Sequence, residues 1–436
     1  MNLTYFGTDG VRGLALASPL TLEETKRWGR AWAEVAQARG IQEMVLGWDP
    51  RTSSEPLARA FAHGVGDRLR LCVLGMVPTP AVSWVTDRRP QAWGLMISAS
   101  HNPPEDNGIK GFDDHGEKLS EEDEAAIEAA FDSISDIEGT PRDLTCYPEH
   151  VEAYLDHLKG LDLPEGFKVV VDCAHGATAP WASRLLRGPG VRFLGVPADG
   201  KRINVGVGST HMDSLQEEVR KTGSDLGIAF DGDGDRCLLV SPEEGLVDGD
   251  QLIWLLAQDL HAKHASLPGV VGTVMSNGGL EQALQDLDIP FVRTQVGDKF
   301  MLRELGKLGW DLAAEASGHI IQKHLGPSGD GLATAIACLE ALLSRTPEQR
   351  WAWQFKPWPL KLVNIKAQER RQLEECTQLT RVAQDLEARF SSTMRVVVRW
   401  SGTEPKLRLM VEAQDEASML DALQRLEQAA RADLGL

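Results

Sequence analysis

The chain has 436 residues and a formal net charge of −19, and its 42% hydrophobic and 25% charged residues are typical of a globular protein with several domains. The acidic balance argues against a nucleic-acid partner, since a phosphate backbone needs a basic surface. We expect no signal peptide, membrane span or membrane partner, and the six scattered cysteines predict a protein of the reducing cytoplasm without disulfides or a cysteine zinc site.

Three segments of the chain share one layout, in which a strand, a polar or glycine-containing loop and a helix follow one another. The first strands are expected at 44–48, 168–172 and 270–274, and the helices run through about 67, 186 and 287. A further strand in each segment, at 94–98, 226–230 and 310–314, runs directly into a conspicuous loop. Ligands gather beyond strand ends in α/β sheets, so these loops are expected to converge on one cleft.

The segment from about 359 onward differs, because its pattern predicts strand, helix, strand, strand, helix, the last helix spanning 416–434. The predicted fold class is α/β, with three similar α/β units with mixed sheets around a central cleft and a smaller α+β C-terminal domain. The predicted domain bounds are 1–150, 151–250, 251–357 and 358–436.

Residues 6–13 form a glycine-rich loop, Phe-Gly-Thr-Asp-Gly-Val-Arg-Gly. Their spacing is not that of a dinucleotide-binding fingerprint, and no strand-length segment precedes them. Arg12 is a candidate cation for a phosphate in the cleft. A simple glycine loop without a function is the alternative.

Ser100 follows the third strand of the first segment, on a turn that continues to Asn102 and Pro103. An exposed hydroxyl there predicts a serine that carries a phosphoryl group. Lys110 is a candidate base if burial among cations lowers its pKa. A plain turn serine and a hydrolase nucleophile beside His101 are the alternatives, although no nucleophile-elbow motif surrounds the serine.

The loop 231–236 reads Asp-Gly-Asp-Gly-Asp-Arg, and alternate positions can turn three carboxylates toward one point. Oxygen ligands favour a hard cation, Mg²⁺ before Ca²⁺ if phosphate completes the shell. An EF-hand is excluded because Arg236 and Pro242 stand where it needs glycine and glutamate, which leaves a solvated acidic turn as the alternative. Arg236 is a candidate phosphate contact. The predicted metal ligands are Asp231, Asp233 and Asp235, with Ser100.

Polar side chains of the third segment are candidates for binding sugar hydroxyls. Glu315, Ser317 and His319 lie in one loop, and Asp298 and Lys299 lie in another. A carboxylate can accept hydrogen bonds from two neighbouring hydroxyls at once. The alternative is that these are ordinary surface polar groups.

Two further polar segments each have a functional or a structural interpretation. Arg399, Ser401, Gly402 and Thr403 offer a guanidinium, hydroxyls and loop amides as a cradle for a distal phosphate, with a plain hairpin turn as the alternative. The acidic run 121–124 is predicted to be only the solvated first turn of a helix. No P-loop sequence occurs, so use of a nucleoside triphosphate is not supported.

With these segments placed, the chain resembles the α-D-phosphohexomutase superfamily over its whole length, and within it the family of bacterial phosphoglucosamine mutases most. The matching motifs are at 5–13, 98–103 with 107–110, 231–236, 315–319, 329–331 and 401–405. The resemblance implies that Ser100 is the phosphoserine and that the three aspartates hold Mg²⁺. It implies a catalytic group of Arg12, Ser100, His101, Lys110 and His319. It also implies a substrate-binding group of Arg236, Asp298, Lys299, Glu315, Ser317, Arg399, Ser401, Gly402 and Thr403.

The implied reaction interconverts glucosamine 6-phosphate and glucosamine 1-phosphate through a hexosamine 1,6-bisphosphate, for the synthesis of UDP-N-acetylglucosamine and cell-wall precursors. The implied cofactors are Mg²⁺, the covalent phosphate and a bisphosphate activator. The implied partners are sugar phosphates, in a monomer or homodimer. Two residues depart from the family pattern, Ala316 in place of glutamine and Trp400 in place of proline. A mutase acting on glucose or mannose phosphates and a non-catalytic sugar-phosphate-binding protein are the alternatives.

Overall fold

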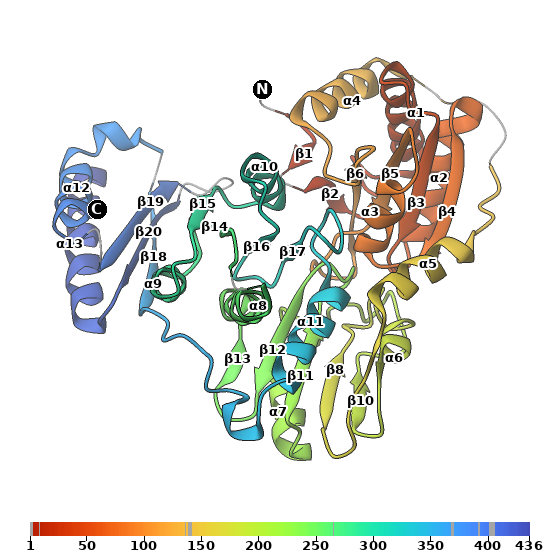
Figure 1. Cartoon of the computed structure of the whole chain (residues 1–436). Helices are drawn as coiled ribbons and strands as arrows, with labels where there is room; N and C mark the ends of the chain where they lie inside the picture. Colours follow the sequence, from red (N-terminus) through yellow and green to blue (C-terminus); the bar gives the residue numbers. More distant parts are fainter. Residues whose placement is uncertain are drawn as a thin grey trace. The chain divides into compact units, whose positions relative to one another are not determined.

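The computed structural model describes residues 3–7, 9–135, 137, 142–264, 266–367, 370–390, 393–400 and 406–436. Contacts divide the chain into two compact units, one made of residues 1–275 and 292–353 and the other of residues 276–291 and 354–436. Figure 1 traces both units. Within the described ranges, no helix has the length and apolar character needed to cross a membrane.

The first α/β domain is built on a six-stranded mixed sheet in the order β1-β2-β6-β5-β3-β4. β3 pairs in parallel with β4 and β5, and β5 pairs antiparallel with β6. The strands are β1 (Phe6–Gly7), β2 (Gly10–Leu14), β3 (Glu43–Trp48), β4 (Arg70–Met76), β5 (Ala92–Ile97) and β6 (Asp106–Phe112). The helices are α1 (Leu22–Ala38), α2 (Ser54–Val65), α3 (Thr79–Asp87), α4 (Glu121–Ser133) and α5 (Pro148–Leu158).

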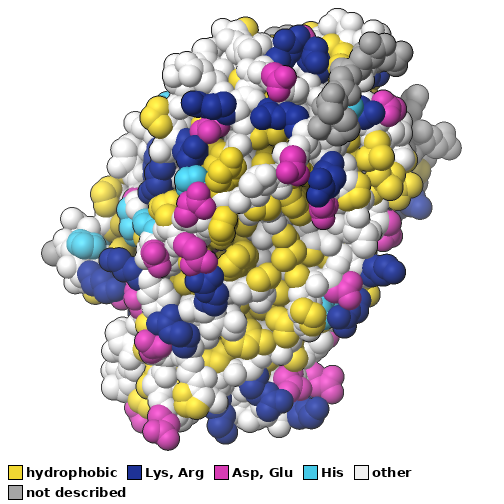
Figure 2. Space-filling view, turned by 90° about the vertical axis from the view of Figure 1, so that its right-hand side faces the viewer, with side chains coloured by type: hydrophobic (Ala, Val, Ile, Leu, Met, Phe, Trp, Pro, Cys, Tyr) yellow, Lys and Arg dark blue, Asp and Glu magenta, His cyan; other side chains and the backbone are white. Residues whose placement is uncertain are grey.

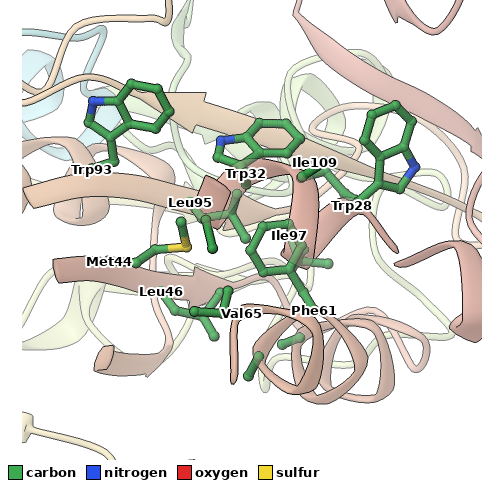
Figure 3. Close-up of a cluster of buried hydrophobic side chains, with 14 of the residues drawn as sticks. Trp28, Trp32, Met44, Leu46, Phe61, Val65, Trp93, Leu95, Ile97 and Ile109 are labelled. Atoms are coloured by element: carbon green, nitrogen blue, oxygen red, sulfur yellow. The ribbon is translucent and has the colours of Figure 1, made fainter. Parts of the chain in front are cut away.

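Both faces of this sheet are buried, because successive side chains of a strand point to opposite faces. Met44 and Leu46 of β3 face Trp32 of α1 and Phe61 of α2 in one hydrophobic core (Figure 3). On the other face, a side chain at Gly47 would collide with Val82 of α3. The parallel strands therefore lie between two layers of helices. Because both faces of the sheet are covered, a polar site is expected at the ends of the strands.

The second and third domains repeat the plan with smaller mixed sheets, in the orders β10-β8-β11-β12-β13 and β15-β14-β16-β17. The second contains β7 (Leu161–Asp162), β8 (Val169–Asp172), α6 (Ala182–Leu185), β9 (Leu186–Arg187), β10 (Val191–Leu194), α7 (Asp213–Thr222), β11 (Leu226–Phe230), β12 (Cys237–Ser241) and β13 (Gly245–Val247). The third contains α8 (Gly249–His264), β14 (Val270–Thr273), α9 (Gly278–Asp286), β15 (Phe291–Thr294), α10 (Asp298–Leu308), β16 (Leu312–Ala314), β17 (Ile320–Gln322) and α11 (Gly331–Leu343). The predicted fold class is confirmed.

One predicted helix is wrong. The helix expected to run through residue 186 is only the four-residue α6, because the chain makes turns before it. Ala174 and His175 have positive φ, and a side chain at Gly176 would stand 2.3 Å from the carbonyl oxygen of Gly232. The backbone of this segment lies directly against the aspartate loop, which leaves no room for a helix.

The C-terminal sheet has the order β18-β20-β19, with all pairs antiparallel. Its elements are β18 (Leu360–Lys366), α12 (Thr377–Phe390), β19 (Met394–Trp400), β20 (Lys406–Ala413) and α13 (Glu416–Leu434). Helix α9 belongs to the same compact unit, where the carboxylate of buried Glu412 accepts a hydrogen bond from the amide of Gly278 at 3.0 Å and pairs with Arg395 at 2.7 Å.

Figure 2 shows the face that lies on the right of Figure 1, where α2, β4 and α5 lie. Hydrophobic side chains form a band across the middle of this face, and basic and acidic side chains alternate around it. The basic side chains here form no continuous surface of the kind a nucleic-acid backbone requires.

Candidate functional site

Ser100 lies just beyond the end of β5 and reaches the aspartate loop of the second domain. Its hydroxyl donates a hydrogen bond to Oδ2 of Asp231 at 2.6 Å, and Nδ1 of His101 lies 3.3 Å from Oγ of Ser100. The residue is only 1% exposed and has a φ of 52°. The expectation of an exposed hydroxyl is therefore wrong, because the aspartate loop covers the serine.

The aspartate loop joins β11 to β12, and its three carboxylates are buried together. One oxygen from each of Asp231, Asp233 and Asp235 lies within 4.8 Å of the others. Burial raises the pKa of Asp231, and the charges of Asp235 and Asp233 raise it further. The Oδ1 atoms of Asp233 and Asp235 are buried and accept no hydrogen bond from any residue that the structure describes. A hard divalent cation fits this set, because it would ligate the free oxygens and offset their mutual repulsion.

Lys110 on β6 is fully buried, but its neighbours are carboxylates rather than the cations expected from the sequence. Its Nζ lies 2.8 Å from Asp233, 3.1 Å from Asp9 and 3.6 Å from Asp235. Burial alone would lower the pKa of Lys110, but these carboxylates outweigh it and raise the pKa above its ordinary value. Lys110 is therefore a cation in this arrangement, and the condition under which it could act as a base, a pKa lowered by surrounding cations, is not met.

Asp9 connects three cations of the site, and no role was predicted for it from the sequence. Its carboxylate pairs with Arg12 and Lys118, and it lies 3.1 Å from Nζ of Lys110. Lys118 also lies 3.4 Å from Asp298 of the third domain. The signal available beforehand was an acidic residue inside the glycine-rich loop of 6–13, three positions before Arg12.

The loop between β16 and β17 brings the third domain to the same place. One carboxylate oxygen of Glu315 accepts the amide of Gly297 at 2.9 Å, and the other accepts the hydroxyl of Ser317 at 3.1 Å. His319 lies between Asp235 and Asp298, at 3.8 Å from each. Burial would lower the pKa of His319, but the hydrogen bond and charge of Asp235 prevail and raise it to about 9.

These loops surround a cavity of about 340 Å³, a size typical of small-molecule sites. Its polar lining residues are Tyr5, Asp9, Arg12, His101, Asp235, Arg236, Asp298, Glu315 and His319. Burial lowers the pKa of His101 to about 4, and Arg236 and Arg12 add to this effect. The cavity thus offers a neutral imidazole, two guanidinium groups and several carboxylates, a set suited to a polar ligand that carries an anion.

The remaining predicted site residues have other surroundings. Lys299 lies 3.3 Å from Glu121 and 3.9 Å from Glu124. Arg399 is an exposed residue of β19 in the second compact unit. Ser401, Gly402 and Thr403 lie outside the described residues.

The acidic first turn of α4 is not merely solvated, as the sequence suggested. Glu124 is 6% exposed and its Oε2 accepts no hydrogen bond among the described residues. Burial raises the pKa of Glu124 to about 7, although Lys299 and Lys118 oppose the shift. Ionisation of Glu124 above neutral pH therefore lowers the stability of the folded protein. The contact of this turn with the third domain thus carries a cost in free energy at that pH.

We expect Glu124→Gln to unfold at a higher temperature than the wild type at pH 8, by about 2 °C if roughly 1 kcal/mol is recovered. The folded-state pKa lies above the unfolded one, so the contribution of Glu124 is most favourable at low pH and is lost as pH rises through 7. The gain should therefore shrink toward pH 5. Melting curves from pH 5 to pH 8 test this, and a gain that is largest at pH 5 would contradict it.

Four family models match the chain in order, and all describe phosphoglucomutase/phosphomannomutase. Alpha/beta/alpha domain I matches residues 3–138, domain II matches 152–245, domain III matches 248–354, and the C-terminal domain matches 362–429.

Curated relatives match nearly the whole chain. A phosphoglucosamine mutase of Geobacillus kaustophilus (strain HTA426) is 39% identical, over 99% of this chain and 99% of its own. One from Symbiobacterium thermophilum is 40% identical over 98% of this chain and 99% of its own. A crystal structure of a phosphoglucomutase/phosphomannomutase family protein from Burkholderia thailandensis shares the fold, with 22% identity, a TM-score of 0.81, and coverage of 98% of this chain and 97% of that one.

Proposed function

The chain belongs to the phosphoglucomutase/phosphomannomutase family of phosphohexomutases, which are isomerases, and we propose that it is a phosphoglucosamine mutase. It interconverts glucosamine 6-phosphate and glucosamine 1-phosphate, and so supplies amino-sugar precursors of the cell wall. Likeness to the curated relatives at 39% and 40% identity supports this choice of sugar. A cytoplasmic location and a monomeric or dimeric state stay predictions.

The observation that carries the proposal is the contact between Ser100 and the aspartate loop. A hydroxyl 2.6 Å from Asp231 lies where a phosphoryl group on it would meet the three carboxylates and the cation they could hold. Mg²⁺ bound there would neutralise negative charge on the migrating phosphoryl group. Arg12 and Arg236 line the adjoining cavity and would hold the phosphate of the sugar.

In the proposed reaction, a free hydroxyl of the sugar phosphate attacks the phosphorus of phosphorylated Ser100. A bond forms between this hydroxyl oxygen and phosphorus, and the bond from phosphorus to Ser100 Oγ breaks. The proton of the attacking hydroxyl ends on Ser100 Oγ, with His319 as the proposed acid/base group. Lys110, which its carboxylate neighbours hold as a cation, would stabilise the negative charge of the migrating phosphoryl group. The bisphosphate then turns around, and the reverse transfer from its other phosphate restores the phosphoserine.

The sugar is the part of the proposal most open to test. We expect the highest kcat/KM on glucosamine 6-phosphate, measured beside glucose 6-phosphate and mannose 6-phosphate with a trace of the matching bisphosphate. Glu315, with its carboxylate fixed by Gly297 and Ser317, is proposed to accept sugar hydroxyls. We therefore expect Glu315→Gln to lower kcat/KM by roughly 10- to 100-fold, since the site would lose one acceptor.

Glucose and mannose phosphates remain the competing substrates, because Ala316 departs from the pattern of phosphoglucosamine mutases. A preference for either one over glucosamine 6-phosphate would replace the proposed sugar and leave the reaction type in place. Absence of turnover on all three sugars, with Ser100 able to accept no phosphate, would favour a binding protein instead.

A further inference from the structure

The backbone of the Ser100 turn is held from behind by side chains that play no part in the chemistry proposed above. The turn leaves β5, and Ser100 takes a positive φ that side-chain-bearing residues rarely adopt. The carbonyl groups of Ser100, Asn102, Pro103 and Asp106 each accept a hydrogen bond from one and the same side chain. This side chain therefore contacts the turn at four points.

The residue that donates these hydrogen bonds is Arg51, and its side chain is completely buried just beyond the end of β3. Its Nη2 donates to the carbonyls of Ser100 at 3.0 Å and of Asn102 at 2.8 Å. Its Nη1 donates to the carbonyls of Asp106 at 3.0 Å and of Pro103. Burying a guanidinium is costly unless its donors are satisfied, and here nearly all of them serve a single turn.

Asp49 orients Arg51 and also reaches the amide side of Ser100. Its Oδ2 accepts from Nε of Arg51 at 2.9 Å and from the hydroxyl of Ser98 at 2.7 Å. The hydroxyl oxygen of Ser98 in turn accepts the amide of Ser100 at 2.9 Å. One buried ion pair therefore holds both the amide and the carbonyl of Ser100.

The second domain holds the same carbonyls from another direction. Nδ2 of Asn204 donates to the carbonyl of Ser100 at 2.8 Å and to that of Asn102 at 3.0 Å. A side chain at Gly200 would stand 2.1 Å from the carbonyl oxygen of Pro50, so the two backbones are in direct contact there. The domain that carries the aspartate loop is thus locked to the turn that carries the serine.

We infer that Arg51, fixed by Asp49 and assisted by Asn204, is a positioning residue that sets the distance between Ser100 Oγ and the aspartate loop during phosphoryl transfer. The inference rests on the proposed function. Transfer needs the attacking oxygen, phosphorus and leaving oxygen nearly in line, and a misplacement of about 1 Å is costly. Loss of the clamp should therefore slow the transfer itself, while sugar binding in the cavity is largely kept.

The test compares Arg51→Lys and Asn204→Ala with a matched control, Arg59→Lys, in the full chain. Among the residues that the structure describes, Arg59 forms an ion pair only with exposed Glu55 on α2, so its substitution should leave activity unchanged. We expect Arg51→Lys to lower kcat by roughly 30-fold with KM within about 3-fold, since lysine keeps the charge but cannot reach four carbonyls. Asn204→Ala should lower kcat by roughly 5-fold. The rate at which a hexose bisphosphate phosphorylates Ser100, measured by mass spectrometry, should fall in both variants together with kcat.

Hydrogen exchange of the segment 98–106 separates this inference from the proposed function. Faster exchange confined to that segment in Arg51→Lys and Asn204→Ala, with a folded remainder, supports the clamp even if the sugar proves to be another. Three results would overturn it. One is unchanged kcat and unchanged exchange in both variants, and another is a rise of KM at constant kcat. Loss of activity explained entirely by a smaller folded fraction would also overturn it.

Discussion

Ser100→Ala should abolish mutase turnover, with kcat at least roughly a thousandfold below the wild type. The substitution removes the oxygen that carries the phosphoryl group between the two transfers in the proposed reaction. It also removes the donor to Asp231 at 2.6 Å, but the buried turn should stay folded because Arg51 holds it through backbone carbonyls. The measurement is the rate on the preferred sugar phosphate, together with the melting temperature.

Intact mass and peptide mapping give a second readout of the same prediction. Wild-type protein incubated with a hexose bisphosphate should carry one phosphoryl group in the peptide containing Ser100, and Ser100→Ala should carry none. Ser133→Ala, at an exposed serine near the end of α4 in the same domain, is the matched control and should behave as the wild type. Phosphate found on another residue, or full activity without Ser100, would refute the phosphoserine mechanism.

The convergence of three loops could be anticipated from the sequence, because each follows a strand in the same repeated layout. The structure brings Ser100 within 2.6 Å of Asp231, and His319 within 3.8 Å of Asp235. Such loops carry their chemistry in a few adjacent residues, and glycines and aspartates at alternate positions leave a local signal. Each loop follows the carboxyl end of its strand, which sets the end of the sheet at which the loop lies.

The supporting residues could not be found this way, since their roles depend on contacts between distant segments. Arg51 meets the Ser100 turn across about fifty residues, and Asn204 meets it across about a hundred. The surroundings of Lys110 could not be predicted for the same reason, because its carboxylate neighbours come from two other loops. Composition near a residue does not reveal which opposite charges a fold will bury beside it.

Helix α9 illustrates a similar limit for domain organisation. By its place in the repeat it follows β14 and belongs to the third domain, yet its contacts put it in one compact unit with the C-terminal sheet. The cause is a long-range interaction, in which Glu412 of β20 accepts the amide of Gly278 at the start of the helix. Negative charge at a helix N-terminus is favourable, and here it is supplied from a strand far along the chain.

Removal of divalent metal is expected to lower turnover at least roughly a hundredfold, with recovery when Mg²⁺ is added back. One oxygen from each of the three buried carboxylates of the aspartate loop lies within 4.8 Å of the others, and the charges of Asp235 and Asp233 raise the pKa of Asp231. Mg²⁺ should therefore also stabilise the folded protein, by about 2.7 kcal/mol when its concentration is a hundred times Kd. Chelation followed by activity assays and melting curves at increasing Mg²⁺ checks both effects.

Asp231→Asn distinguishes a metal site from a merely acidic loop. The variant should lose both the activity and the stabilisation by Mg²⁺, yet the metal-free variant should melt at or above the temperature of the metal-free wild type. The reason is that asparagine removes one of three repelling buried charges, while its side-chain oxygen can still accept from Ser100. Asp213→Asn, at an exposed aspartate of α7 in the same domain, should keep the full response to Mg²⁺. Stabilisation of Asp231→Asn by Mg²⁺ equal to that of the wild type would place the cation elsewhere.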